Sequence, residues 1–313
     1  MLLLLLFLLI NSVFSNYDVV GWFVGSNLTQ LEKLPWESYT TIRVGNVIVD
    51  ENGFPSCSND KTFLKAIELA ELYNKKITLS PGINVDKCIK EPIDHQYCNN
   101  YINNLPNMFD NCYSEVLQGL EFDMEWVGYI NSLGVINQKY VTKFSQLMNQ
   151  MQLSIGNNYT VSCDVGIYFF HVSPWVNKEI FINNPNLFVN TMSYHTPLDC
   201  SIERWKYDAL TINKKWGIPK SQINIGIGYF TVIRNIFLKI LYEPIWNNLH
   251  IQCPNISYSD CICNKIPYVS AEMNYKIGKF IKDEGYRGSF PWAANYDNLD
   301  KPLVNYLLKG LNQ

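Results

Sequence analysis

The stretch that decides the fold is Gln118-Gly119-Leu120-Glu121-Phe122-Asp123-Met124-Glu125-Trp126. From Glu121 onwards an acid stands at every second position, with large apolar residues between the acids. Successive side chains of a β-strand point to opposite faces, so this pattern predicts a strand that buries its apolar side against helices and turns a row of carboxyls inward. Buried ionisable groups are costly unless they are paired, share protons or face water. The stretch therefore indicates an acidic site inside the fold.

The spacing of the three acids adds a chemical expectation. At roughly 3.3 Å per residue, Glu121 and Glu125 lie about 13 Å apart, with Asp123 midway. Carboxyls this close in a poorly solvated pocket do not all ionise freely, so at least one pKa should be raised and a proton retained near neutral pH. A retained proton is what a general acid needs. The alternative is a half-buried strand whose acids form salt bridges with Lys or Arg of a neighbouring strand.

This stretch resembles the signature strand of family 18 glycoside hydrolases, the chitinase-like proteins, whose pattern is Asp-x-x-Asp-x-Asp-x-Glu. Asp123 and Glu125 match the last two acids, whereas Gln118 and Glu121 stand where the family has aspartates. Enzymes of the family use the final Glu as proton donor, and inert lectin-like members commonly lack it. The resemblance therefore implies that Glu125 is the general acid.

Apolar strand-like runs alternate along the chain with segments of helical length. The expected strands are 19–24, 41–49, 76–79, 120–126, 160–166, 187–194, 223–229 and 288–294, and the expected helices are 61–73, 138–154, 202–216, 269–284 and 299–311. This alternation suggests an α/β fold, either a (β/α)8 TIM barrel or a doubly wound sheet, and the family resemblance favours the barrel. The remaining residues fit two Cys-containing loop excursions, at roughly 85–112 and 231–265.

Two later motifs support the same resemblance. Thr191-Met192-Ser193-Tyr194 is similar to the family's Met-x-Tyr motif, whose Tyr holds the acetamido carbonyl of the substrate, although His195 follows it where Asp or Asn is usual. Gly285 to Trp292 resembles the eighth strand, whose Trp forms the floor under the sugar being cleaved. Both motifs end predicted strands, and active groups of a TIM barrel stand at the C-terminal ends of its strands.

Weaker matches occur at the first, third and seventh strands, in Val19 to Trp22, Leu79 to Gly82 and Ile225 to Tyr229. Arg43, within the expected second strand, occupies a position that is usually aromatic or small in the family. Two interpretations are open for this residue. It is either a counter-charge for the buried acids or an outward-facing side chain.

The resemblance implies a substrate-assisted, retaining hydrolysis, in which the carbonyl oxygen of the substrate's own 2-acetamido group is the nucleophile. Glu125 would protonate the glycosidic oxygen and later activate water. Asp123 would orient the acetamido N–H, Tyr194 would hold its oxygen, and Glu121 would tune Asp123 by sharing a proton. The expected substrate-binding residues are Glu121, Trp292, Met192, Trp126 and Tyr229. Neither a metal nor a cofactor is expected, and the expected partner is chitin or another glycan that contains N-acetylglucosamine.

Two other functions are compatible with this sequence. One is a non-catalytic chitin-binding lectin on the same fold, favoured by the altered residues Gln118, Glu121 and His195. The other is an endo-β-N-acetylglucosaminidase acting on N-glycans, because such enzymes commonly alter the acids before the final Glu. A net charge of -3 and a pI near 5.8 argue against nucleic acid and anionic membranes as partners.

The N-terminus predicts export. Residues 1–15 are almost entirely apolar and too short for a membrane-spanning helix, so they are expected to be a signal peptide, with residues 16–313 forming the family 18 catalytic barrel. Sequons at Asn27, Asn158 and Asn255 would then be glycosylated. The expected location is secreted, extracellular or in a lysosome-like endomembrane compartment, without stable membrane insertion after removal of the leader.

Nine cysteines agree with an oxidising compartment, and their odd number leaves at least one thiol unpaired within the chain. Cys163, inside an apolar strand-like run, is predicted to be the buried free thiol. Two clusters in stretches that look irregular are expected to form local disulfides, and they are Cys88, Cys98 and Cys112, and Cys253, Cys261 and Cys263.

Overall fold

The computed structural model describes residues 17–113, 115–123, 136–167, 173–194, 201–234, 240–244, 253, 255, 257–263, 266–297 and 302–313. The predicted signal peptide lies outside these residues, as do Glu125, Trp126 and His195.

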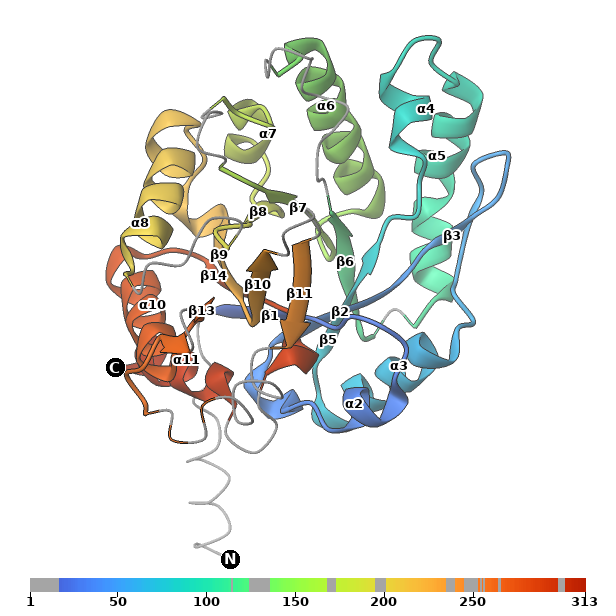
Figure 1. The fold of residues 1–313 in the computed structure, drawn as a ribbon. Helices are drawn as coiled ribbons and strands as arrows, with labels where there is room; N and C mark the ends of the chain where they lie inside the picture. The colour runs from blue at the N-terminus through green and yellow to red at the C-terminus, as the bar shows by residue number, and fades with distance from the viewer. Residues whose placement is uncertain are drawn as a thin grey trace, which may run out of the picture.

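Eight parallel strands close into a barrel surrounded by helices (Figure 1). In spatial order they are β1 Asp18–Trp22, β14 Gly288–Trp292, β9 Ile223–Gly228, β8 Leu187–Thr191, β7 Thr160–Val165, β6 Leu117–Phe122, β5 Lys76–Ser80 and β2 Thr41–Asn46. Each of the eight expected strands contributes one strand of the barrel, so the TIM-barrel prediction is confirmed.

Helices follow most of the strands and form the outer ring seen in Figure 1. They are α2 Leu28–Glu32, α3 Lys61–Tyr73, α4 Val85–Ile89, α5 His95–Asn111, α6 Gln138–Ile155, α7 Lys178–Ile182, α8 Glu203–Leu210, α10 Ala271–Glu284 and α11 Leu303–Asn312, with short turns η1 Trp36–Ser38, η2 Thr211–Lys215, η3 Lys220–Gln222 and η4 Ala294–Tyr296. Local signals set their ends. In α3, the Asp60 side chain accepts from the backbone N–H groups of Thr62 and Phe63, and Asn74 ends the helix in a left-handed conformation.

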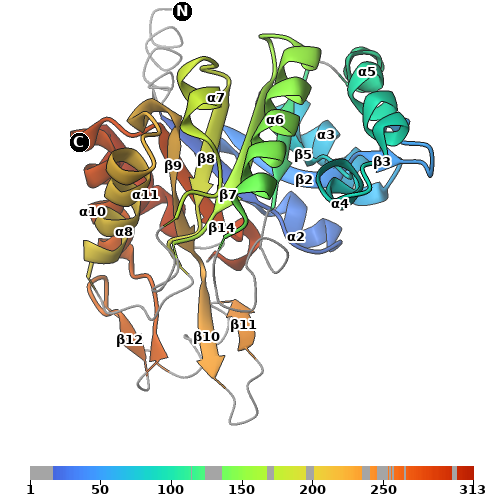
Figure 2. The ribbon, with the colours of Figure 1, turned by 90° about the horizontal axis from the view of Figure 1, so that it is seen from above.

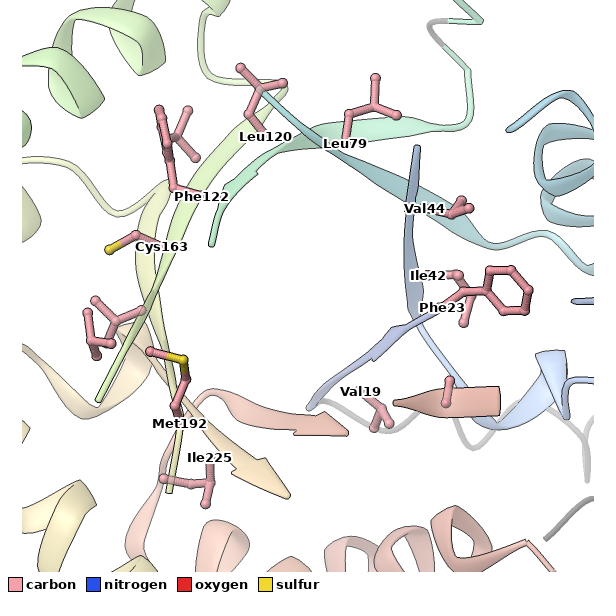
Figure 3. Close-up of a cluster of buried hydrophobic side chains, with 14 of the residues drawn as sticks. Val19, Phe23, Ile42, Val44, Leu79, Leu120, Phe122, Cys163, Met192 and Ile225 are labelled. Carbon is pink, nitrogen blue, oxygen red and sulfur yellow. The ribbon is translucent and has the colours of Figure 1, made fainter. Parts of the chain in front are cut away.

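The apolar side chains of alternate strand positions encircle the barrel on its outer side, against the helices (Figure 3). Ile42 and Val44 on β2, and Leu120 and Phe122 on β6, belong to this outer set. Phe122 packs edge-to-face on Phe144 of α6, with ring centroids 5.2 Å apart. Because strand side chains alternate, the residues between these apolar positions point into the barrel.

The first excursion differs from the expectation of an irregular stretch, because α4 and α5 occupy most of it. Asn84 and Asp94 cap these two helices through their side chains, which explains how such a polar, Asn-rich segment becomes helical. The Cys88–Cys98 disulfide joins α4 to α5. It is the local bond expected of this cluster, and the third cysteine, Cys112, bonds Cys57, beside the small β3–β4 sheet of Ile48–Val49 and Pro55–Ser56.

The second excursion follows β9 and projects from the end of the barrel at which the strands finish (Figure 2). It contains two antiparallel pairs, β10 Phe230–Arg234 with β11 Ile240–Pro244, and β12 Ile262–Cys263 with β13 Ile266–Pro267. Cys253 and Cys263 form a local disulfide, as expected for this cluster. Cys261 is also disulfide-bonded.

Cys163 is a buried free cysteine, and the prediction for this residue is confirmed. It belongs to the apolar set on the outer side of the barrel (Figure 3). The sequon residues Asn27, Asn158 and Asn255 are all exposed. None of the helices described has the length and apolar character needed to cross a bilayer.

Candidate active site

Glu121 lies inside the barrel on β6 and is completely buried. Its Oε2 accepts hydrogen bonds from Asn190 Nδ2 at 3.1 Å and from Ser162 Oγ at 3.5 Å. Its Oε1 lies 3.8 Å from Arg43 Nε and has no hydrogen-bond partner among the described residues. The carboxyl is therefore held by neutral donors on one oxygen and faces a cation with the other.

A second buried carboxyl, Asp164 on β7, extends this inner network. Asn190 Nδ2 on β8 also donates to Asp164 Oδ1 at 2.9 Å, and Asn224 Nδ2 on β9 donates to Asn190 Oδ1 at 3.1 Å. Asp164, Asn190 and Asn224 are all fully buried. Asn190 thus links Glu121 to Asp164, and Asn224 extends the network to a fourth strand.

Burial dominates the titration of these acids. It raises the pKa of Glu121 to about 7, while the charge of Arg43 and the hydrogen bond from Asn190 oppose the rise. Burial, followed by the charges of Glu121 and Asp123, holds the pKa of Asp164 well above its usual range. Burial, more than the spacing of the acids, therefore favours a retained carboxyl proton in the barrel interior near neutral pH.

Asp123 directly follows β6 and lines a cavity of about 620 Å³ at the C-terminal end of the barrel. Its carboxyl reaches solvent through this cavity, yet the surrounding protein still raises its pKa, and the charge of Arg43 acts in the opposite direction. Asp123 is therefore the member of this acidic set that is placed to meet a ligand.

Aromatic rings form one wall of the same cavity. Tyr194, just after β8, stacks on Trp292 at the end of β14, with ring centroids 6.0 Å apart and planes inclined by 18°. Phe230 packs edge-on against both rings, at 5.5 Å from Tyr194 and 5.0 Å from Trp292. Trp22 of β1 also lines the cavity and pairs in register with Trp292. Flat rings beside a carboxylate suit the faces and polar groups of a sugar.

The structure brings together Asp123, Tyr194 and Trp292 around this cavity and places Glu121 in the network behind it. Two other predicted binding residues lie elsewhere. Met192 is buried in the apolar core. Tyr229 is fully buried outside the cavity lining, and its hydroxyl donates to Asn274 Oδ1 of α10 at 3.0 Å.

Tyr229 has a clear structural reason for its position. It directly follows β9 and continues the odd-numbered face of Ile225 and Ile227, and Ile225 lies on the outer side of the barrel (Figure 3). The period of two therefore directs Tyr229 towards the helices, and this signal was available in the sequence. Gln118, which replaces a family aspartate, accepts a hydrogen bond from Thr41 Oγ1 near the start of β6, away from the cavity.

Several participants of the site did not stand out in the sequence. Asp164 and Asn190 interrupt apolar runs at inward positions, and strand alternation after Cys163 would have pointed to Asp164.

Arg43 faces inward, so the counter-charge interpretation is the one that the structure supports. Among the described residues there is no cluster of His, Cys, Asp or Glu able to hold a metal ion.

Comparison of the sequence with protein-family models found no match, and comparison with curated proteins found none either. Solved structures do share the fold. A chitinase from Bacteroides thetaiotaomicron aligns with a TM-score of 0.71 and 18% identity, over 93% of this chain and 95% of that one. A GH18 chitinase from Cycas revoluta in complex with (GlcNAc)3 gives 0.69 and 14%, over 93% and 99%. The spore cortex-lytic enzyme SleL of Bacillus megaterium gives 0.65 and 14%, over 94% and 73%.

These likenesses extend across most of the chain and show its fold. The chain has the (β/α)8 fold of the family 18 chitinases, and the expectation drawn from the β6 motif is confirmed at the level of the fold.

Proposed function

We propose that this protein hydrolyses β-1,4-linked N-acetylglucosamine polymers or oligomers by the substrate-assisted, retaining mechanism. One observation carries the proposal, namely that Asp123, Tyr194 and Trp292 line a single cavity at the end of the barrel where TIM-barrel enzymes hold their active groups. Glu125 stands two residues after Asp123 in the sequence, where the resemblance places the proton donor.

In this proposal the sugar ring packs against Trp292 while its acetamido group lies between Asp123 and Tyr194. The Asp123 carboxylate accepts from the acetamido N–H, and the Tyr194 hydroxyl donates to the acetamido oxygen. Asp123 also stabilises the positive charge that develops when this oxygen attacks the anomeric carbon. Glu125 gives its proton to the leaving glycosidic oxygen and then activates a water molecule.

The same proposal includes export of the protein. Three disulfide bonds within the described residues are expected of a protein that folds in an oxidising compartment. The exposed sequon asparagines are accessible to the glycosylation machinery of such a compartment.

Hydrolysis of short N-acetylglucosamine oligomers by the parent protein and by Glu125→Gln tests the function. We expect cleavage by the parent and a loss of several orders of magnitude in kcat for the variant. Glu115→Gln is the matched control, because Glu115 is exposed and precedes β6 at the opposite end of the barrel. Binding of oligomers without cleavage by the parent would favour the lectin. Release of N-glycans from glycoproteins, without cleavage of oligomers, would favour the endo-β-N-acetylglucosaminidase.

A further inference from the structure

Arg43 is a cation placed inside the barrel of this chain. Its guanidinium carbon lies 3.8 Å from the centroid of the Trp22 ring, and its Nε lies 3.8 Å from Glu121 Oε1. Only about a tenth of the side chain is exposed, at 11%. Strand register places Arg43 beside Trp22 on one side and Thr78 of β5 on the other. The ring face and the neighbouring strands thus hold the guanidinium between the cavity and the inner acids.

At this position a single cation interacts electrostatically with three acids. Arg43 is the only Lys, Arg or His among the buried residues that the structure describes, and the only one among the described residues lining the cavity. The charges that act on it come from Glu121, Asp164 and Asp123. Its described neighbours on β1 and β5, Trp22 and Thr78, carry no charge.

The contact between Arg43 and Glu121 is an ion pair without a hydrogen bond. Neither Arg43 Nε nor Glu121 Oε1 has a hydrogen-bond partner within the described residues. Coulomb attraction is long-ranged, so the pair neutralises charge without a fixed donor–acceptor geometry. An uncompensated cation beside Asp123 would oppose the positive charge of the proposed intermediate. Where Glu121 is ionised, its charge cancels that effect and leaves the negative charge on Asp123.

We propose that Arg43 is a positioning residue whose fixed positive charge favours the ionised forms of Glu121 and Asp123 against the effect of burial, and so favours a charged Asp123 at the cavity. An opposite charge within about 4 to 6 Å lowers a carboxyl pKa by about 1 to 3 units, and a guanidinium stays charged even when buried. Only the catalytic consequence of this role rests on the proposed hydrolysis. The charge balance itself is a property of the barrel interior.

The test is carboxyl titration by ¹³C NMR in protein labelled at Asp and Glu side chains, with Glu121→Gln and Asp123→Asn used to assign the two signals. Arg43→Met should raise the pKa of Glu121 by about one unit or more and should raise the pKa of Asp123 in the same direction, and Arg43→Lys should raise both less. Arg287→Met is the matched control. Arg287 pairs with Asp18 at 2.6 Å and lies over the Phe188 ring at 4.2 Å, but it precedes β14 at the far end of the barrel, so both signals should stay unchanged.

If Arg43→Met does not fold, the pKa of Asp123 is compared between Glu121→Gln and the double variant Arg43→Met/Glu121→Gln. The double variant buries neither charge of the pair, so it should fold. The pKa of Asp123 should be higher in the double variant. Unchanged carboxyl titration after loss of the cation would overturn the inference. In an active protein, the acidic limb of kcat/KM should move to higher pH with the carboxyls. If the carboxyl pKa values shift as expected in a protein that cleaves no oligomer, the charge balance stands and the proposed function is rejected.

Discussion

Replacing Glu121 by Gln should change how the stability of the fold depends on pH. The substitution keeps the size and the acceptor oxygen that Asn190 and Ser162 contact, and it removes the ionisable group. It also leaves Arg43 without its closest carboxylate, which costs stability at every pH. The informative quantity is therefore how the difference in the free energy of unfolding between the two proteins changes with pH, and not its value at any single pH.

The magnitude follows from the pKa of Glu121. Burial raises this pKa from 4.5 to about 7, so the folded protein keeps a proton that the unfolded chain loses between these two values. The parent is stabilised by this proton at low pH and loses that stability as the pH rises from about 4.5 through 7. At 1.36 kcal/mol per unit, the loss is on the order of 3 kcal/mol. The variant lacks this term, and removal of the Glu121 charge also lowers the pKa of Asp164, which acts in the same direction.

Urea unfolding with intact disulfides, measured from pH 4.5 to 8 for the parent and Glu121→Gln, gives this quantity. The free energy of unfolding of the variant relative to the parent should rise by about 3 kcal/mol across the range, with equal m-values. Glu115→Gln serves as the control, since its exposed side chain should give a curve parallel to that of the parent. A curve for Glu121→Gln that is also parallel would refute the raised pKa of Glu121.

Three further predictions follow from the cavity and the core. Tyr194→Phe should lower kcat about a hundredfold with little change in Tm, because the ring can still stack on Trp292 while the hydroxyl is lost. An unchanged kcat would remove Tyr194 from the mechanism. Trp292→Ala should weaken oligomer binding roughly tenfold in calorimetry, since an aromatic stacking partner is lost. Equal affinity would show that this ring does not contact the sugar. Cys163 should react with a thiol reagent only after denaturation, because it is buried and its pKa is raised by burial. Rapid labelling of the native protein would contradict its place in the core.

Strand alternation was enough to predict which side chains of β6 enter the barrel. The acids at Glu121 and Asp123 face inward because Leu120 and Phe122 need the apolar helices outside, and a period of two admits no other arrangement. The same reasoning would have directed Asp164 inward and Tyr229 outward. The resemblance to a family drew attention to the motif positions and away from this simpler pattern.

Other features depend on contacts that the local sequence does not encode. The hydrogen bonds from Ser162 and Asn190 to Glu121 exist because β7 and β8 adopt a particular register, with Glu121 opposite Ser162 and Asp164 opposite Asn190. The pairing of Cys57 with Cys112 spans 55 residues and brings the β3–β4 sheet against the end of α5. Side-chain caps, together with packing on α6, make helices of a segment whose composition alone suggested a loop.

The most direct test of the proposed mechanism is the configuration of the first product formed from a β-linked N-acetylglucosamine oligomer, followed by ¹H NMR within the first minutes of reaction. A substrate-assisted, retaining reaction predicts the β-anomer first, with the α-anomer appearing only as the sugar equilibrates. If the α-anomer appears first, water attacks the sugar directly, and the account of Asp123, Tyr194 and the acetamido group is wrong.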